Sequence, residues 1–124
     1  MPVLTVHSAG PGVTVQDLGR TGWTAQGLSR GGAADRLALL EAAALLDQDT
    51  GLAVLEMAGF GGVFSTDRPV RIALTGALMQ ADMDGVPVPP NTSQLLAAGA
   101  KLTIGGARAG VYGYLAFAGG IVTQ

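Results

Sequence analysis

A strand that ends in a polar turn is predicted for Val13-Thr14-Val15-Gln16-Asp17-Leu18-Gly19-Arg20-Thr21-Gly22. The two valines alternate with polar residues, which is strand spacing, and the glycine at position 19 breaks the pattern. Gln16, Asp17 and Arg20 therefore place three groups that can bind polar ligands within five residues. An aspartate and an arginine on a turn can equally pair with each other or cap local backbone groups, so this stretch alone leaves both interpretations open.

Short apolar runs separated by glycine or proline make up most of the chain outward from this stretch, at a spacing of roughly eight to twelve residues. Asp84-Gly85 between two such runs predicts a two-residue hairpin, and the prolines that follow predict an edge strand. Helical spacing occurs over residues 33–46, which are apolar on nearly all sides and should be covered by the sheet and by a partner. We therefore expect a mostly β (α+β) fold, a barrel or sandwich with one main helix.

Three other places carry candidate functional groups. Asp35 and Arg36 fall in the first turn of the predicted helix, where the acid either complements the helix dipole or lies beside N–H groups that receive an anionic substrate. Glu56 lies in the apolar run 52–57, either as a general acid or base or, as is commoner, paired with an arginine. His7 ends a predicted strand without a nucleophile motif nearby, which favours an ordinary hydrogen-bonded histidine over a general base.

Composition excludes several classes of function. The net charge is −2 and basic residues do not cluster, which argues against binding to nucleic acid. The chain has no cysteine and a single histidine, so we expect no thiolate chemistry and no metal site of the Cys or multi-His type. Neither a secretory signal nor a membrane-spanning run is evident, which predicts a cytoplasmic protein without a membrane segment. Only 13% of the residues are charged, so we expect apolar surface that a partner covers.

Several motifs occur together in an order that is shared with one known family. Through these motifs the chain resembles the allophanate hydrolase subunit 2 family, also called the KipA-like family or the family of the 5-oxoprolinase C-type subunit. The same motifs resemble part of the carboxyltransferase region of urea carboxylase. Gln-Asp-Leu-Gly-Arg and Ala-Gly-Gly-Ile are the most specific of them. The motifs are Thr14-Val15-Gln16-Asp17-Leu18-Gly19-Arg20-Thr21-Gly22, Gly32-Ala33-Ala34-Asp35-Arg36, Leu55-Glu56, Leu74-Thr75-Gly76-Ala77, Asp84-Gly85-Val86-Pro87-Val88 and Tyr114-Leu115-Ala116-Phe117-Ala118-Gly119-Gly120-Ile121.

The resemblance covers essentially all of this chain but only the amino-terminal lobe of the family. It implies that residues 1–124 form that lobe, with the carboxy-terminal lobe absent, and that the lobe is a cyclophilin-like β-barrel. Two positions depart from the family pattern, Gly31 in place of the usual Ser and Ala34 in place of the usual Met. If that serine hydroxyl touches the substrate, the change at Gly31 bears directly on activity.

The function implied by the resemblance is that of a subunit in an ATP-dependent amide-processing complex. The first expectation is 5-oxoprolinase, which converts 5-oxoproline to glutamate with a KipI-like subunit 1 and a LamB/YcsF-type subunit. One alternative is carboxyl transfer from carboxybiotin in a urea carboxylase or urea amidolyase system; another is a non-catalytic KipA-like regulatory binding module. Lys101, the sole lysine, does not lie between methionines and would not carry biotin. The chain alone is expected to be inactive.

Both chemistries act on a small amide and need negative charge stabilised on the amide oxygen. We therefore predict Asp17 and Arg20 as catalytic residues, with Gln16 beside them in substrate binding. Asp35, Arg36 and Glu56 are predicted to line the same substrate-binding cleft. The sequence leaves open whether nucleotide contacts this chain.

Overall fold

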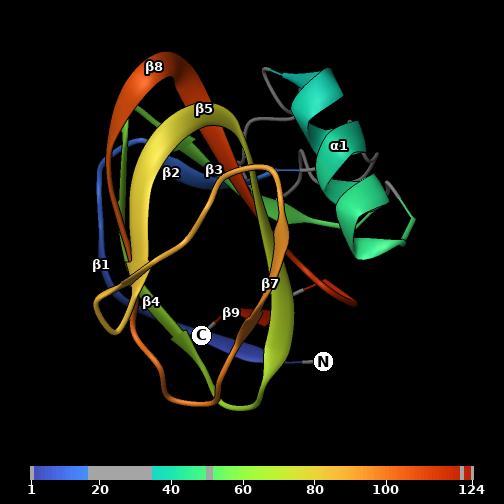
Figure 1. Ribbon diagram of the computed structural model, residues 1–124, viewed down its shortest axis with the longest axis vertical. Helices are drawn as coiled ribbons and strands as arrows, with labels where there is room; N and C mark the ends of the chain where they lie inside the picture. The colour runs from blue at the N-terminus through green and yellow to red at the C-terminus, as the bar shows by residue number, and fades with distance from the viewer. Residues whose placement is uncertain (1, 17–34, 50–51, 121, 124) are drawn as a thin grey trace, which may run out of the picture.

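The computed structural model describes residues 2–16, 35–49, 52–120 and 122–123, and the predictions for Asp17, Arg20, Gly31 and Ala34 fall outside these ranges. Within them, one curled sheet carries a single helix on its outer side (Figure 1). The expected mostly β fold with one main helix is confirmed, and the sheet forms a curled half-barrel. The elements are β1 (Val3–Ala9), β2 (Val13–Gln16), α1 (Arg36–Leu46), β3 (Val54–Ala58), β4 (Phe60–Thr66), β5 (Val70–Met83), β6 (Val86–Pro87), β7 (Ser93–Leu96), β8 (Leu102–Phe117) and β9 (Val122–Thr123).

The sheet is organised around the long strand β8. Its strands follow the order β2-β3-β8-β4-β1-β9, and β5 pairs with β8 as well as with β6 and β7. All of these pairings are antiparallel except that of β1 with β9, which is parallel. Because β8 pairs with β4 through its first half and with β3 through its second half, it joins the two parts of the sheet.

The strands β5 and β8 each run through a stretch whose sequence predicts two short strands, 70–74 and 77–83 for β5, and 102–104 and 111–118 for β8. A bulge joins the halves: Gly76 pairs with Gly113 and Leu78 with Ala109, so one residue of β5 lies opposite the three residues 110–112 of β8. The glycines at positions 76 and 110 both have a φ of +81°, which favours glycine over any other residue. The punctuating glycines therefore bend the strands without ending them, as the two arching ribbons in Figure 1 show.

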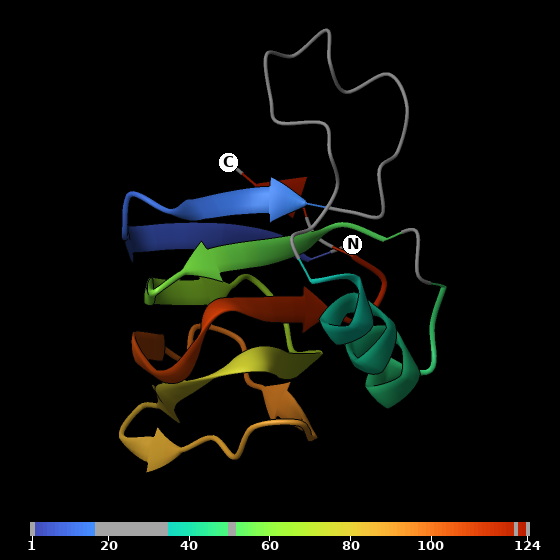
Figure 2. The ribbon, with the colours of Figure 1, turned by 90° about the horizontal axis from the view of Figure 1, so that it is seen from above.

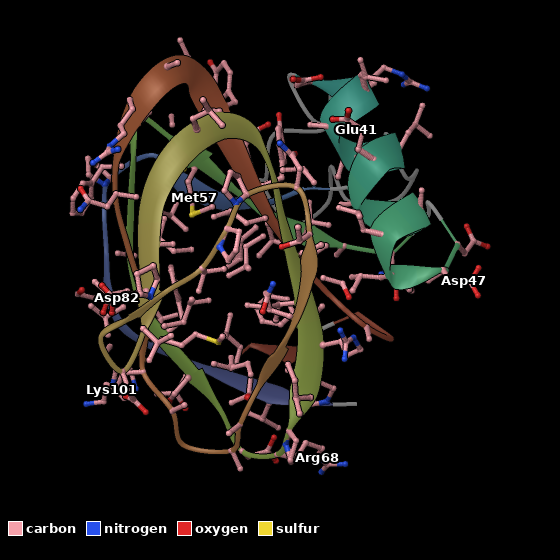
Figure 3. The ribbon with its side chains drawn as sticks, viewed as in Figure 1. Glu41, Asp47, Met57, Arg68, Asp82 and Lys101 are labelled. Carbon is pink, nitrogen blue, oxygen red and sulfur yellow. The ribbon has the colours of Figure 1, made fainter. Side chains whose placement is uncertain are left out.

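The sheet buries apolar side chains on both of its faces. The inner face holds the larger core, which includes Met57, seen inside the curl in Figure 3, together with Phe64 and Leu115. The outer face packs against the buried stripe of α1, where Ala38, Leu39 and Ala42 of the helix meet the sheet. This second core explains why strands such as β3 are buried along almost their whole length.

The helix α1 lies beside the sheet, at one end of the strands in Figure 2. It begins later than predicted, because Asp35 has extended backbone and caps the helix instead of standing in its first turn. The helix ends where Asp47 adopts the left-handed conformation, with a φ of 52°. Next to this end, the Gln48 side chain donates to the Phe117 carbonyl at 3.2 Å and accepts from the Gly119 N–H at 2.9 Å, which ties the helix end to β8.

Two turn predictions have different outcomes. Asp84 and Gly85 both have positive φ and join Met83 to its partner Val86, so the primed hairpin turn is confirmed and β6 is an edge strand. The run Gly59-Phe60-Gly61-Gly62 is typical of a glycine-rich bend, and the structure bends there only at Gly59, which has a φ of 78°, because β4 already begins at Phe60. The glycines there do serve close packing, since a Cβ on Gly61 would lie 2.6 Å from the Cβ of Ile104.

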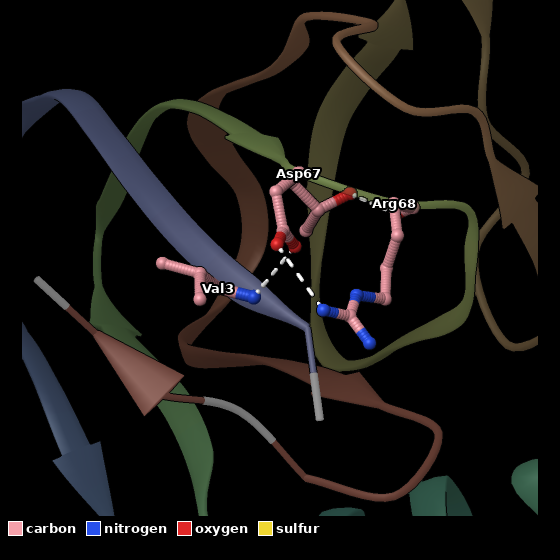
Figure 4. Close-up of polar contacts among 4 residues, drawn as sticks. Val3, Asp67 and Arg68 are labelled. Carbon is pink, nitrogen blue, oxygen red and sulfur yellow. Dashed lines mark hydrogen bonds and ion pairs between the residues drawn. The ribbon is translucent and has the colours of Figure 1, made fainter.

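A polar contact ties β1 to the turn after β4 (Figure 4). The Val3 N–H donates to Oδ1 of Asp67 at 2.8 Å, and Arg68 lies 3.5 Å from Oδ2 of the same carboxylate. The Val3 N–H, helped by the Arg68 charge, lowers the pKa of the Asp67 carboxyl below its usual value. This carboxylate therefore stabilises the strand pairing of β1 while it is ionised.

Candidate functional site

A hydrogen-bonded group of two side chains and the Asp35 backbone joins the start of α1 to the sheet. The Tyr114 hydroxyl of β8 donates to Oε2 of Glu56 on β3 at 2.6 Å, and it accepts the backbone N–H of Asp35 at 2.8 Å. The Asp35 carboxylate in turn accepts the Ala38 N–H at 3.1 Å as the helix cap. A buried carboxylate, a buried phenol and a helix start are thus connected in one chain of hydrogen bonds.

Tyr114 is the most buried member of this group, with 0% of its surface exposed, and Glu56 is 8% exposed. Burial, followed by the hydrogen bond to Glu56, raises the pKa of the Tyr114 hydroxyl well above its ordinary value. The phenol therefore keeps its proton and acts as a donor to the carboxylate throughout the neutral range. At 2.6 Å the hydrogen bond from Tyr114 to Glu56 is short for a hydroxyl donor.

Polar residues form a row across four strands beneath the helix. The register pairs Thr14 with Glu56, Glu56 with Tyr114, and Tyr114 with Thr75, so all four share one face of the sheet. The Thr75 hydroxyl donates to the Ala38 carbonyl at 2.8 Å, inside the first turn of α1. Tyr114 and Thr75 of this row lie among the apolar residues that pack against α1, and they are the two that bond to the helix start.

A groove of about 560 Å³ opens beside this row, between the helix and the bulge of β5 and β8. Such a volume is in the range of small-molecule sites. The helix side contributes Asp35 and Glu41 to the lining, and the bulge contributes backbone and exposed apolar side chains; Figure 3 labels Glu41 on α1. The described residues that line the groove are Asp35, Glu41, Gly76, Ala77, Leu78, Ala109, Gly110, Val111 and Tyr112.

The structure brings together some of the site residues predicted from the sequence. Asp35 lines the groove and bonds to Tyr114, which bonds to Glu56, so these two predicted residues belong to one network. Gln16 is the last residue of β2, and its backbone lies opposite Val54, two residues before Glu56. Arg36 is the exposed first residue of α1. Their predicted roles in substrate binding stay predictions.

Metal binding and a histidine base find no support among the residues that the structure describes. In those ranges, no group of three or more His, Cys, Asp or Glu side chains is placed to hold a metal ion. The His7 ring contacts the Ser65 hydroxyl at 2.8 Å through Nε2, as an ordinary strand histidine would. None of the helices in the described ranges is both long enough and apolar enough to span a membrane.

Sequence reasoning missed Tyr114, Thr75 and Glu41 as members of the site. A usable signal was present for the first two, because a phenol or hydroxyl in an otherwise apolar strand needs a hydrogen-bond partner when it is buried. Glu56, in another such strand, was the complementary acceptor. Glu41 gave no such signal, because its place beside the bulge depends on how the helix lies on the sheet.

Comparison with known proteins places this geometry among related chains. Residues 26–124 match the family described as carboxyltransferase domain, subdomain A and B. The chain is 34% identical over 109 residues to the C-type subunit of 5-oxoprolinase from Haemophilus influenzae, covering 88% of this chain and 35% of that protein. It is 38% identical over 122 residues to the C-type subunit of 5-oxoprolinase from Escherichia coli, covering 96% and 38%. The chain therefore spans little more than a third of the length of these curated relatives.

Solved structures agree with the fold. The crystal structure of TTHA0988 matches with a TM-score of 0.83 and 34% identity, over 96% of this chain and 25% of that one. The urea carboxylase of Kluyveromyces lactis matches with a TM-score of 0.84 and 24% identity, over 94% of this chain and 10% of that one. The half-barrel with one outer helix is thus found in both proteins.

Proposed function

Because this chain belongs to the family of the carboxyltransferase domain, subdomain A and B, we propose that it contributes a substrate-binding lobe to an amide-processing enzyme complex. The reaction proposed first is that of 5-oxoprolinase, the opening of 5-oxoproline to glutamate. One observation carries this choice: identity of 34% and 38% to two 5-oxoprolinase subunits of the same type extends over 88% and 96% of the chain. The proposal concerns the whole protein, of which these residues supply one part.

The groove beside α1 is the proposed place for the amide. Its volume suits a small cyclic amide, and the carboxylates of Asp35 and Glu41 can orient an amide N–H. The oxygen of the amide needs positive charge or N–H donors as its carbonyl is attacked or activated. We assign that part to Arg20, with Asp17 as the base and Gln16 as a further donor to the substrate. Arg36, next to Asp35 in the chain, does not line the groove, and we propose that it attracts an anionic substrate from the groove's edge.

Nucleotide phosphates do not suit the described part of this groove. Its described lining contains two acids and no lysine or arginine, whereas phosphates are bound by cationic side chains or by free N–H groups at a helix start. At this helix start, the Asp35 carboxylate already accepts the Ala38 N–H. We therefore propose that ATP is bound by a partner subunit, and that this lobe presents the amide.

The proposed partners are a KipI-like subunit 1 and a LamB/YcsF-type subunit. The test uses the full-length protein, reconstituted with both, and measures ATP consumption and glutamate release with 5-oxoproline as the substrate. We expect turnover that requires all subunits and is lost when Asp17 or Arg20 is replaced by alanine. Full activity without this protein, or unchanged activity of both variants, would refute the assignment.

A second candidate is carboxyl transfer, which the description of the matching family favours. In that case carboxybiotin, carried by another protein, supplies the carboxyl group, and the groove binds urea or a similar amide. Reconstitution with biotin carboxylase, bicarbonate, ATP and urea separates the two reactions. Turnover only under these conditions would replace 5-oxoprolinase by carboxyl transfer, and tight partner binding with silence on both substrates would indicate a KipA-like regulatory module.

A further inference from the structure

The first turn of α1 is held by two hydroxyl groups from neighbouring strands. Tyr114 of β8 accepts the Asp35 N–H at 2.8 Å, and Thr75 of β5 donates to the Ala38 carbonyl at 2.8 Å. These two residues lie directly opposite each other in the register of β5 and β8. One pair of cross-strand neighbours therefore contacts both the cap and the first turn of the helix.

The same two strands form the far wall of the groove. On β5 the groove lining starts at Gly76, directly after Thr75, and on β8 it ends at Tyr112, two residues before Tyr114. The near wall is formed by Asp35 and Glu41 of the helix side. Hydrogen bonds from Thr75 and Tyr114 to the first turn therefore connect the two walls of the groove directly.

Apolar packing alone would fix the helix less well. The contact between α1 and the sheet is rich in alanine, with Ala38 and Ala42 on the helix and Ala73 and Ala116 on the strands. Leu39 is the larger buried helix side chain in this contact, and the alanines around it interlock little, so they resist a shift of the helix only weakly. Buried, fully paired polar bonds discriminate between such positions because a shift leaves their groups unpaired.

We propose that Tyr114 and Thr75 are positioning residues that fix the first turn of α1 and thereby set the width of the substrate groove. Glu56 completes the arrangement, because its carboxylate accepts the hydrogen bond that the Tyr114 hydroxyl donates, and the hydroxyl oxygen accepts the Asp35 N–H. This role rests on the proposed function, since the groove is the proposed amide site. Neither hydroxyl touches the substrate; both act through Asp35 and Ala38.

The test compares substitutions in the full-length protein within its reconstituted complex. Tyr114→Phe removes the phenol oxygen, and Thr75→Val removes the other hydroxyl, whereas Thr75→Ser keeps it. Thr66→Val is the matched control. Thr66 is the last residue of β4 and is also buried, and its hydroxyl donates at 2.9 Å to the carbonyl of Arg68 in the turn that follows, away from α1. Kinetics are measured well below the melting temperature of the least stable variant, together with hydrogen exchange of the amides of residues 35–39.

We expect Tyr114→Phe and Thr75→Val to lower kcat/KM for the amide at least about tenfold, because small displacements of positioned groups are costly in catalysis. Thr75→Ser should restore most of the loss, and Thr66→Val should leave kcat/KM unchanged despite a lower Tm. Exchange in the first turn should accelerate at least about tenfold in the first two variants only.

Wild-type kcat/KM in Tyr114→Phe and Thr75→Val would reduce both residues to a structural role and overturn the proposal. Unchanged exchange at residues 35–39 would overturn it whether or not the complex turns over. A wild-type complex without turnover on any amide refutes the proposed function and with it the positioning role in catalysis. Accelerated exchange at residues 35–39 in the Tyr114→Phe and Thr75→Val forms of such a complex would show that the proposed function is wrong while the attachment of the helix is as described.

Discussion

Replacement of Gly76 by alanine should destabilise the protein more than the same change at any exposed glycine turn. Gly76 has a φ of +81°, and a Cβ at this position would lie 2.5 Å from the Tyr112 carbonyl oxygen and 3.0 Å from Cδ2 of Tyr114. Both neighbours belong to β8, which is paired to β5 on the other side of the bulge. Relief of the contact therefore requires a shift of backbone and not only of a side chain.

The magnitude follows from two separate terms. Left-handed backbone costs a residue with a Cβ about 1–2 kcal/mol. Overpacking in a close contact adds about 1–3 kcal/mol when the neighbours cannot move freely. Gly99→Ala is the matched control, because Gly99 has a φ of +75° with nothing within 4 Å of the added Cβ, and carries only the first term. The free energy of unfolding should therefore fall by about 2–5 kcal/mol at Gly76 and by about 1–2 kcal/mol at Gly99.

Urea unfolding of the wild type and the two variants measures both values. The slope of the free energy against urea should stay the same in all three proteins, which shows that the comparison concerns stability alone. The reduced conformational freedom of the unfolded chain is common to both substitutions and cancels in the difference. Equal destabilisation at Gly76 and Gly99 would refute the close approach of β5 and β8 beneath the start of α1.

Three further predictions concern titration and packing. Burial and the Glu56 bond raise the pKa of Tyr114, so above about pH 10 this hydroxyl loses its proton in the unfolded chain but keeps it in the folded protein. The free energy of unfolding should therefore fall there by up to about 1.4 kcal/mol per pH unit more than in Tyr114→Phe. Asp67 has a lowered pKa, so its contribution is present above the ordinary value of 3.8 and is lost as the pH falls below it; Asp67→Asn should flatten the acid limb of the stability curve. The Leu39 side chain is 2% exposed, and Leu39→Ala should lower the free energy of unfolding by about 2–4 kcal/mol in thermal unfolding. The Leu37 side chain is 65% exposed, and Leu37→Ala should change that free energy by less than about 0.5 kcal/mol.

The local sequence pattern was sufficient to predict most of the strands, turns and the helix. The hairpin at Asp84-Gly85 was predictable because few residues other than these adopt two successive positive φ values. The buried stripe of the helix was predictable because Ala38, Leu39 and Ala42 recur at helical spacing. Each of these signals depends only on residues that are neighbours in the sequence.

The continuity of the long strands β5 and β8 could not be predicted from the local sequence. Glycines at positions 76 and 110 look like strand ends, yet their positive φ values belong to a bulge within paired strands. Whether a glycine ends a strand or bends it depends on what lies across the sheet, which local pattern does not contain. The same limit applies to Asp35, which was predicted inside the helix and caps it, because the Tyr114 hydroxyl that holds its backbone comes from a distant strand.

The placement of polar groups in this fold links the barrel to the proposed site. The inner core is apolar, whereas the outer face of the same strands carries Glu56, Tyr114 and Thr75 under the first turn of α1. Each of these groups would be costly to bury alone. The helix start supplies an N–H to Tyr114 and a carbonyl to Thr75, and the Tyr114 hydroxyl donates to Glu56. A helix attached in this way can keep a contact surface rich in alanine, because hydrogen bonds add to the packing of Leu39 in setting its position. The bulge that forms the opposite wall is shaped by backbone geometry, with positive φ values at Gly76 and Gly110, so both walls of the groove are set by elements of the fold.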